Sequence, residues 1–128
     1  MAEPITVTGQ KKISTLQSEF SEKFPHLGIL LFSEMEYERS CRGERVRPLS
    51  SDQTIASVRT KKNTKGLSIH GRTHIGTLEK KFLDEYGLRV QVCIKRNGKG
   101  RYTGDGFDGH SLTAVEQHAE TRGWDLWM

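Results

Sequence analysis

An internal repeat constrains this chain more than any other feature of its sequence. The run from Ile5 to Phe24 has the same spacing of Gly, Ile, Thr, Leu and Phe as the run from Leu67 to Tyr86, 62 positions later. A repeat of this period is typical of one supersecondary unit that has been copied, because each copy buries its apolar face against the other. We therefore expect two similar halves that share a core.

The length of the chain favours one fused domain. Its 128 residues divide into halves of about 60, and units of that size are marginal alone because they bury too little surface. Hydrophobic residues make up only 34% of the chain, but they are grouped and periodic, which argues against disorder. We expect residues 1–60 to form the first repeat, residues 61–66 a basic linker, and residues 67–128 the second repeat with a Trp-containing tail.

Each half begins with a predicted strand and helix. Alternating apolar runs at residues 5–7 and 67–69 end at a glycine and are typical of short strands. Apolar residues then recur at i, i+4 and i+8, which places them on one face of a helix. The capping-box spacing of Ser14 with Gln17 predicts that the first helix starts just after Ser14, and Gly76 occupies the matching place in the second half.

The second half continues with a hairpin and a helix. Residues 88–94 alternate as a half-buried strand does, and Asn97-Gly98 is typical of a type I′ turn into a further strand at residues 99–103. The final helix is expected from Ser111 to about Thr121, with a glycine cap after it.

The first half has a strand at residues 27–32, a polar insertion at residues 34–43, an edge-strand pattern at residues 46–49 and a short helix from Thr54. The complete pattern predicts an α+β fold. It consists of two tandem β-α-β-β-α repeats related by pseudo-twofold symmetry, with the helices packed on one face of a mixed sheet.

Basic residues gather in the two hairpin regions and in the linker, although the net charge is only +4. Such segments can form a stripe for phosphate backbones, with a tyrosine available to stack on a base. The alternative is that they only guard exposed hairpins against edge-to-edge aggregation. The candidate nucleic-acid-binding residues are Arg45, Arg47, Lys61, Lys62, Lys65, Lys95, Arg96, Lys99, Arg101 and Tyr102.

Both tryptophans of the chain lie in one short segment, at Trp124 and Trp127. Residues this large and apolar seldom cluster without something to cover. Two alternatives follow: the tail docks onto the core, or it is an exposed patch and the two tryptophans bind a partner.

The remaining motifs do not indicate catalysis or a cofactor. The glycine pattern at residues 104–109 contains two aspartates that would repel a pyrophosphate, so a flexible turn is expected. His70 and His74 have a zinc-binding spacing but lie around a strand end, where solvent-facing side chains are expected. Cys41 and Cys93 lack a CxxC spacing and are expected to be free thiols. We expect no metal and no cofactor, and these motifs favour a binding protein over an enzyme, which stays as a third alternative.

The sequence gives no indication of membrane insertion. No apolar run approaches the length that crosses a bilayer, and the first residues lack the basic and apolar regions of a signal peptide. A cytoplasmic location is therefore expected.

The doubled pattern Gly-x3-Ile-x-Thr-Leu-x3-Phe resembles that of small uncharacterised bacterial proteins built of tandem β-α-β-β units. The resemblance implies a fold and carries no catalytic residue. The element order also resembles KH-type RNA-binding units, but these need a Gly-x-x-Gly loop between two helices, which neither half has. The residues that carry the first resemblance are Gly9, Ile13, Thr15, Leu16 and Phe20, with Gly71, Ile75, Thr77, Leu78 and Phe82.

These observations together predict a non-enzymatic binding or adaptor module. Its leading form is weak nucleic-acid binding through the basic hairpins and linker. The alternative is a protein–protein interaction module that uses sheet edges or the tryptophan tail.

Overall fold

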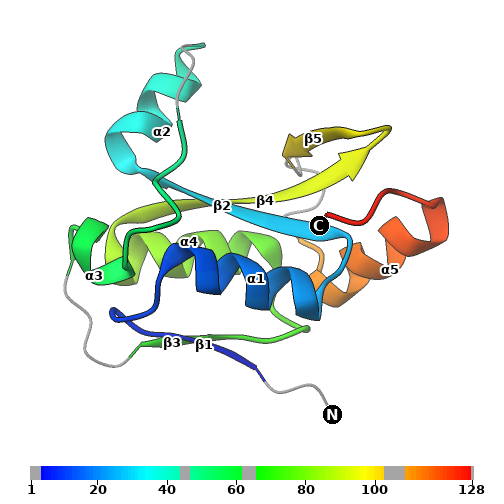
Figure 1. Cartoon of the computed structure of the whole chain (residues 1–128), viewed down its shortest axis with the longest axis horizontal. Coiled ribbons are helices and arrows are strands. Elements are labelled where there is room, and N and C mark those ends of the chain that lie inside the picture. Colours follow the sequence, from blue (N-terminus) through cyan, green and yellow to red (C-terminus); the bar gives the residue numbers. More distant parts are fainter. Residues whose placement is uncertain (1–3, 44–46, 62–65, 103–108, 128) are drawn as a thin grey trace.

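The computed structural model describes residues 4–43, 47–61, 66–102 and 109–127. This part of the chain contains five helices and five strands (Figure 1). In chain order they are β1 (Ile5–Val7), α1 (Ile13–Lys23), β2 (Leu27–Ser33), α2 (Glu34–Cys41), α3 (Ile55–Val58), β3 (Leu67–Ile69), α4 (Ile75–Tyr86), β4 (Leu88–Arg96), β5 (Lys99–Tyr102) and α5 (Leu112–Arg122).

The strands form two antiparallel sheets. β1 pairs with β3, and the larger sheet has the order β2-β4-β5. In Figure 1, α1 and α4 lie between these two sheets. The α+β class is confirmed, but the predicted single mixed sheet is wrong, because the described strands form two sheets and each of their pairings is antiparallel. Apolar alternation shows which residues are buried and does not show which strands become neighbours.

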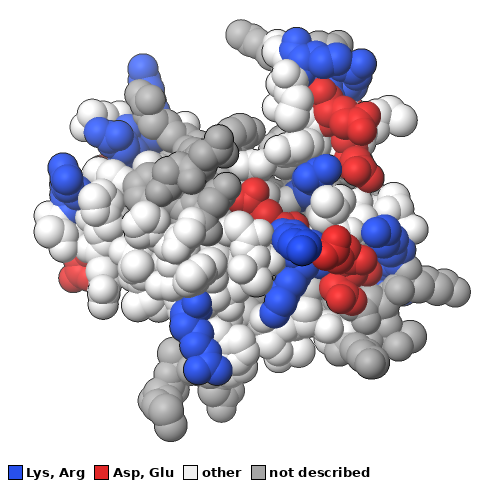
Figure 2. All heavy atoms as spheres, turned by 180° about the vertical axis from the view of Figure 1, so that it is seen from behind, with Lys and Arg blue, Asp and Glu red and all other residues white. Residues whose placement is uncertain are grey.

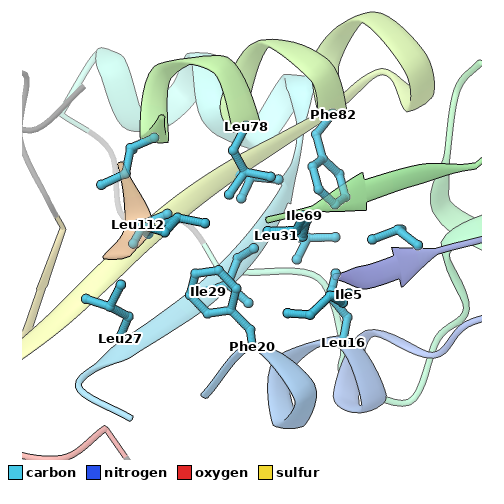
Figure 3. Packing of buried hydrophobic residues seen from close by; sticks show 14 of the residues in the cluster. Ile5, Leu16, Phe20, Leu27, Ile29, Leu31, Ile69, Leu78, Phe82 and Leu112 are labelled. Atoms are coloured by element: carbon cyan, nitrogen blue, oxygen red, sulfur yellow. The ribbon is translucent and has the colours of Figure 1, made fainter. Parts of the chain in front are cut away.

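One apolar core contains residues from both halves, and helices and strands contribute to it from several sides (Figure 3). Phe20 and Phe82 are fully buried, as their helical spacing predicts. The ring of Phe20 packs against Phe24, and that of Phe82 packs against Tyr86. The buried Tyr86 hydroxyl donates a hydrogen bond of 3.2 Å to the Val7 carbonyl, so its polar atom has a partner.

The predicted helix starts, just after Ser14 and Gly76, are each two residues too late. α1 begins at Ile13 and α4 at Ile75, and neither has a side-chain cap. The N–H groups of Ile13 and Ile75 instead donate to carbonyls in the segments before α3 and α5, at 2.9 and 3.0 Å. Backbone acceptors from distant segments replace the local caps that the sequence pattern indicates.

These contacts belong to a matched set of backbone hydrogen bonds in the two halves. Three hydrogen bonds of the first half each have a counterpart in the second half, and the two donor–acceptor distances in such a pair differ by 0.1 Å. In two of the three pairs, the two acceptor residues are 62 positions apart in the sequence. The pairs are Ile13 to Gln53 and Ile75 to His110, Ile55 to Lys11 and Leu112 to Thr73, and Ala56 to Gly9 and Thr113 to Gly71, with the N–H donor named first.

The first half differs from the second after β2. The polar insertion forms α2, whose N-cap Ser33 accepts a hydrogen bond of 3.2 Å from the Glu36 N–H. The strand predicted at residues 46–49 does not form in the described residues 47–49, and Val46 lies outside them. Leu49 makes a single strand-like contact there, through its N–H to the Leu31 carbonyl at 2.7 Å.

The edge of β2 away from β4 is covered by neighbouring groups. Three successive outward carbonyls of this edge accept hydrogen bonds, which blocks positions where another strand would pair. The acceptors and donors are Leu27 with Ser21 Oγ at 2.9 Å, Ile29 with Gln17 Nε2 at 3.1 Å, and Leu31 with the Leu49 N–H at 2.7 Å.

Truncation of the two central phenylalanines tests the shared core. Phe20→Ala and Phe82→Ala should each lower the free energy of unfolding by about 3–5 kcal/mol, since each removes a fully buried ring. Denaturant unfolding of the intact chain measures the change. Thr77→Ala, at an exposed position of α4, is the control and should change stability by less than ~0.5 kcal/mol. Equal, small effects at all three positions would show that the helical faces are assigned wrongly.

Candidate nucleic-acid interface

The β4–β5 hairpin presents basic side chains at one end of the larger sheet. Its two-residue turn has left-handed backbone at both positions, with φ of 52° at Asn97 and 77° at Gly98, as a type I′ turn requires. Lys95 is half-buried, and Arg96 and Lys99 are exposed. The hairpin prediction is confirmed, and it places three cations within five residues.

Residues 124–127 dock beside this hairpin. The Asp125 N–H donates to the Lys95 carbonyl at 3.0 Å, one residue beyond the pairing of Leu27, the first residue of β2, with Ile94. The Asp125 carboxylate accepts from the Gly98 N–H at 2.7 Å. The Trp127 N–H donates to the Pro25 carbonyl at 2.9 Å. Figure 1 shows this red segment returning from α5 toward the sheet.

Trp127 lies on the outer face of the sheet, over Gly28 and Gly100. A Cβ built on Gly28 of β2 would lie 2.0 Å from Trp127 Cε2, and one built on Gly100 of β5 would lie 3.4 Å from Trp127 Cη2. The indole therefore reaches from β2 to β5 across β4. Glycine is required at position 28, where a Cβ would overlap the ring, whereas a Cβ on Gly100 would only touch it at ordinary contact distance.

Trp124 packs against the core and positions an arginine. The Arg96 guanidinium carbon lies 5.3 Å from the centre of the Trp124 ring, at cation–π distance. The His118 ring meets the Trp124 ring edge-on, with centroids 5.2 Å apart. The contact holds the planar, multidentate guanidinium near the hairpin turn.

We call this assembly the hairpin corner, consisting of Lys95, Arg96, Lys99, Trp124 and Trp127. It unites two sets of candidate residues that the sequence presents as alternatives, the basic hairpin and the tryptophan segment. Within the described residues 95–99 and 124–127, three cationic side chains stand against one carboxylate, that of Asp125, so these two segments together are basic. Cations beside indole rings are the groups that bind phosphates and bases.

The residues just before β2 are held near this corner by hydrogen bonds to α5. His26 donates its backbone N–H to Glu116 of α5 at 2.8 Å, and the His26 ring Nδ1 also bonds that carboxylate. Both side chains are about 15% exposed, at 15% and 14%. The Pro25 carbonyl, the acceptor for Trp127, therefore lies in a segment that is tied to α5.

The other predicted basic residues do not gather at the corner. Lys61 bonds through its N–H to the Tyr86 carbonyl, at the opposite end of β4, roughly 25 Å away by the rise of nine strand residues. Arg47 is exposed near Leu49, on the β2 side of the sheet. On the face in Figure 2, basic groups are spread out, and those at the α2 end lie beside acidic ones. Arg45, Lys62 and Lys65 lie outside the described residues, and for Arg101 and Tyr102 only the backbone pairing is described.

The remaining motifs add no second reactive centre within the described residues. His70 is half-buried and His74 exposed, and no three His, Cys, Asp or Glu side chains in this part of the chain group as metal ligands would. Most of the glycine pattern, residues 104–108, lies outside the described residues. Both cysteines are free, with Cys41 exposed and Cys93 buried. Among the described helices, none has the length and hydrophobicity to cross a bilayer.

A separate hollow of about 200 Å³ lies between α2 and the outer face of the sheet, lined by Phe32, Tyr37, Ser40, Cys41 and Gln91. Burial, followed by the neighbouring Cys41, raises the pKa of Tyr37. The Arg89 guanidinium lies 4.6 Å from the Tyr37 ring centre. α2 itself has no buried residue, and Met35 on it is 71% exposed.

Sequence reasoning did not include the glycines and polar groups that assemble the corner. Gly28 interrupts an apolar strand, and a glycine inside a strand often marks a close approach of other atoms, so its position was an available signal. Asp125 and His118 give no comparable signal, because their roles depend on tertiary contacts.

Comparison of the chain with protein-family models, with curated proteins and with solved structures finds no match in any of the three.

A methyl group at Gly28 tests the docking of Trp127. Gly28→Ala should displace the indole, because the new Cβ would overlap it, and should cost about 1–3 kcal/mol of stability. Cys93 lies opposite Gly28 in the β2–β4 register, and burial raises the pKa of its thiol to about 12, so the wild-type thiol should resist labelling. In the variant, a thiol reagent should label Cys93 as well as Cys41.

Gly109→Ala is the matched control, because a Cβ there meets nothing within 4 Å. It should leave Cys93 protected. Equal labelling of Cys93 in the wild type and in Gly28→Ala would contradict the docking described above.

Proposed function

We propose that this chain is a non-enzymatic binding module of the cytoplasm that holds nucleic acid weakly at the hairpin corner. The observation that carries the proposal is the convergence of three cations and two indoles on one end of the sheet. Lys95, Arg96 and Lys99 supply phosphate contacts, and the tryptophans supply aromatic surface.

The number of cationic side chains at the corner sets the expected affinity for nucleic acid. Three phosphate contacts correspond to a log–log salt slope of about −2 for a single strand, since each contributes about −0.7. The Asp125 carboxylate, bonded to the Gly98 N–H, lowers the positive potential at the corner. An affinity in the non-specific range, about 10⁻⁴ to 10⁻⁶ M, agrees with so few contacts.

Binding of a protein partner is the second candidate. The observation that favours it is α2, a helix without a buried residue that carries the exposed Met35. Solvent-exposed apolar side chains on an uncovered helix are typical of interaction surfaces. The covered edge of β2 disfavours strand addition there, and Trp124 and Trp127 are available to a partner only in part, since both are half-buried.

We also infer that the two halves are copies of one unit related by pseudo-twofold symmetry. The matched backbone hydrogen bonds at the starts of α1 and α4, and the pairing of β1 with β3 and of β2 with β4, support this. An experimental structure should superpose residues 5–32 on 67–94 with one extra residue at Pro25-His26. The first half has α2 where the second has its hairpin, so one chain carries one corner.

The salt dependence of binding tests the proposed function. Fluorescence anisotropy of a short labelled oligonucleotide should show affinity that falls between about 50 and 200 mM salt. Lys95→Gln, Arg96→Gln or Lys99→Gln should each weaken binding and make the slope shallower by about 0.7, because each removes one phosphate contact.

Lys61→Gln is the matched control, because it removes the same charge at the far end of β4. It should leave the slope unchanged. If neither single- nor double-stranded probes bind at low salt, or if Lys61→Gln matches the hairpin variants, the corner is not a nucleic-acid site, and the α2 surface becomes the leading candidate.

A further inference from the structure

We propose that the ligand of the hairpin corner is an unpaired nucleic-acid strand, with one base stacked on Trp127 and the adjacent phosphate bound by Lys95, which pairs with Gly100 and so lies on the same face of the sheet as Trp127. This rests on the proposed function and names its substrate class. The distinction matters because the three cations alone would bind paired and unpaired strands in a similar way.

The indole of Trp127 meets the sheet with one of its faces. Its atoms Cε2, Nε1 and Cδ2 lie at nearly equal distances, 2.0, 2.3 and 2.4 Å, from the position of a Cβ on Gly28. A Cβ bond projects out of a sheet, so similar distances to three central ring atoms indicate face-on contact. The opposite face of the ring is directed away from the sheet, and the side chain remains only half-buried.

The ring is held in place before any ligand arrives. The Trp127 N–H is bonded to the Pro25 carbonyl at 2.9 Å, and Asp125 joins the same segment to Lys95 and Gly98. A fixed aromatic surface loses little conformational entropy when a base stacks on it. This segment therefore provides a preformed platform.

The two tryptophans have different roles in this arrangement. Trp124 is packed against the core and already contacts the Arg96 guanidinium and the His118 ring. It acts as a positioning residue that holds Arg96 near the hairpin turn. Trp127 is the residue whose outward face serves as the stacking surface, on the face of the sheet that also carries Lys95, the partner of Gly100 in the β4–β5 register.

An aromatic platform selects unpaired strands for a geometric reason. Bases in a duplex are already stacked on their neighbours, whereas unpaired bases can be splayed and stacked on aromatic side chains. One such contact changes affinity by about 5- to 150-fold, which matches or exceeds the effect of a single phosphate contact. A preference for single strands therefore follows from Trp127 and does not follow from the charges.

The test compares a labelled oligothymidylate with a labelled self-complementary hairpin duplex. The wild type should bind the single strand at least about 5-fold more tightly at the same salt concentration. Trp127→Leu should remove this preference and leave the salt slope unchanged, and Trp127→Phe should retain part of it. Leu126→Ala, at the exposed neighbour that is 57% accessible, is the control and should bind as the wild type does.

A second measurement avoids dependence on the folding of Trp127→Leu. Trp124→Phe leaves Trp127 as the only tryptophan of the chain. Oligothymidylate should quench its fluorescence as the single strand binds, while the duplex should not. Binding of the single strand without quenching would overturn the stacking role.

The outcomes separate the two proposals. Equal affinity for single strand and duplex, with the expected salt slope, would keep the nucleic-acid function and overturn the choice of an unpaired strand. Absence of binding to either probe at low salt would overturn both.

Discussion

The pairing of β2 with β4 is the constraint on which the rest of the structure depends. These strands come from different halves and pair over seven residues, from Leu27 with Ile94 to Ser33 with Leu88. Their inner face supplies the apolar side chains that α1 and α4 cover. Their outer face carries Gly28, on which Trp127 rests. The same ladder thus fixes both the core and the candidate binding surface, so a shift of its register would disrupt both.

Much of this fold follows from periodicity. The apolar spacing around Phe20 and Phe82 predicted both long helices, and Asn97-Gly98 predicted the hairpin, because these patterns reflect local geometry. The helix starts were wrong because distant carbonyls satisfy the first N–H groups. α2 was missed because it has no buried face and hence no apolar stripe, and its local indications were the cap at Ser33 and the acidic residues of its first turn.

The candidate site was predictable only in its components. Composition identified Lys95, Arg96 and Lys99 as a cationic group and the tryptophans as residues that need a surface. Their convergence depends on where Trp127 docks, and that docking depends on Gly28, which is distant in the sequence and adjacent in space. Lys61 shows the converse, since it belongs to the same basic pattern but lies at the other end of β4. A sequence pattern conveys charge and size, and tertiary pairing determines proximity.

The covered edge of β2 has a consequence for how copies of this chain can meet. Head-to-tail growth of the larger sheet would require β5 of one molecule to pair with β2 of the next, and such a heterologous contact propagates into a filament. The groups bonded to the Leu27, Ile29 and Leu31 carbonyls obstruct that contact. Any association through this sheet is then restricted to β5 against β5, an isologous contact that closes after two molecules. The side chains of Gln17 and Ser21 and the Leu49 N–H thereby block the growth of such a filament.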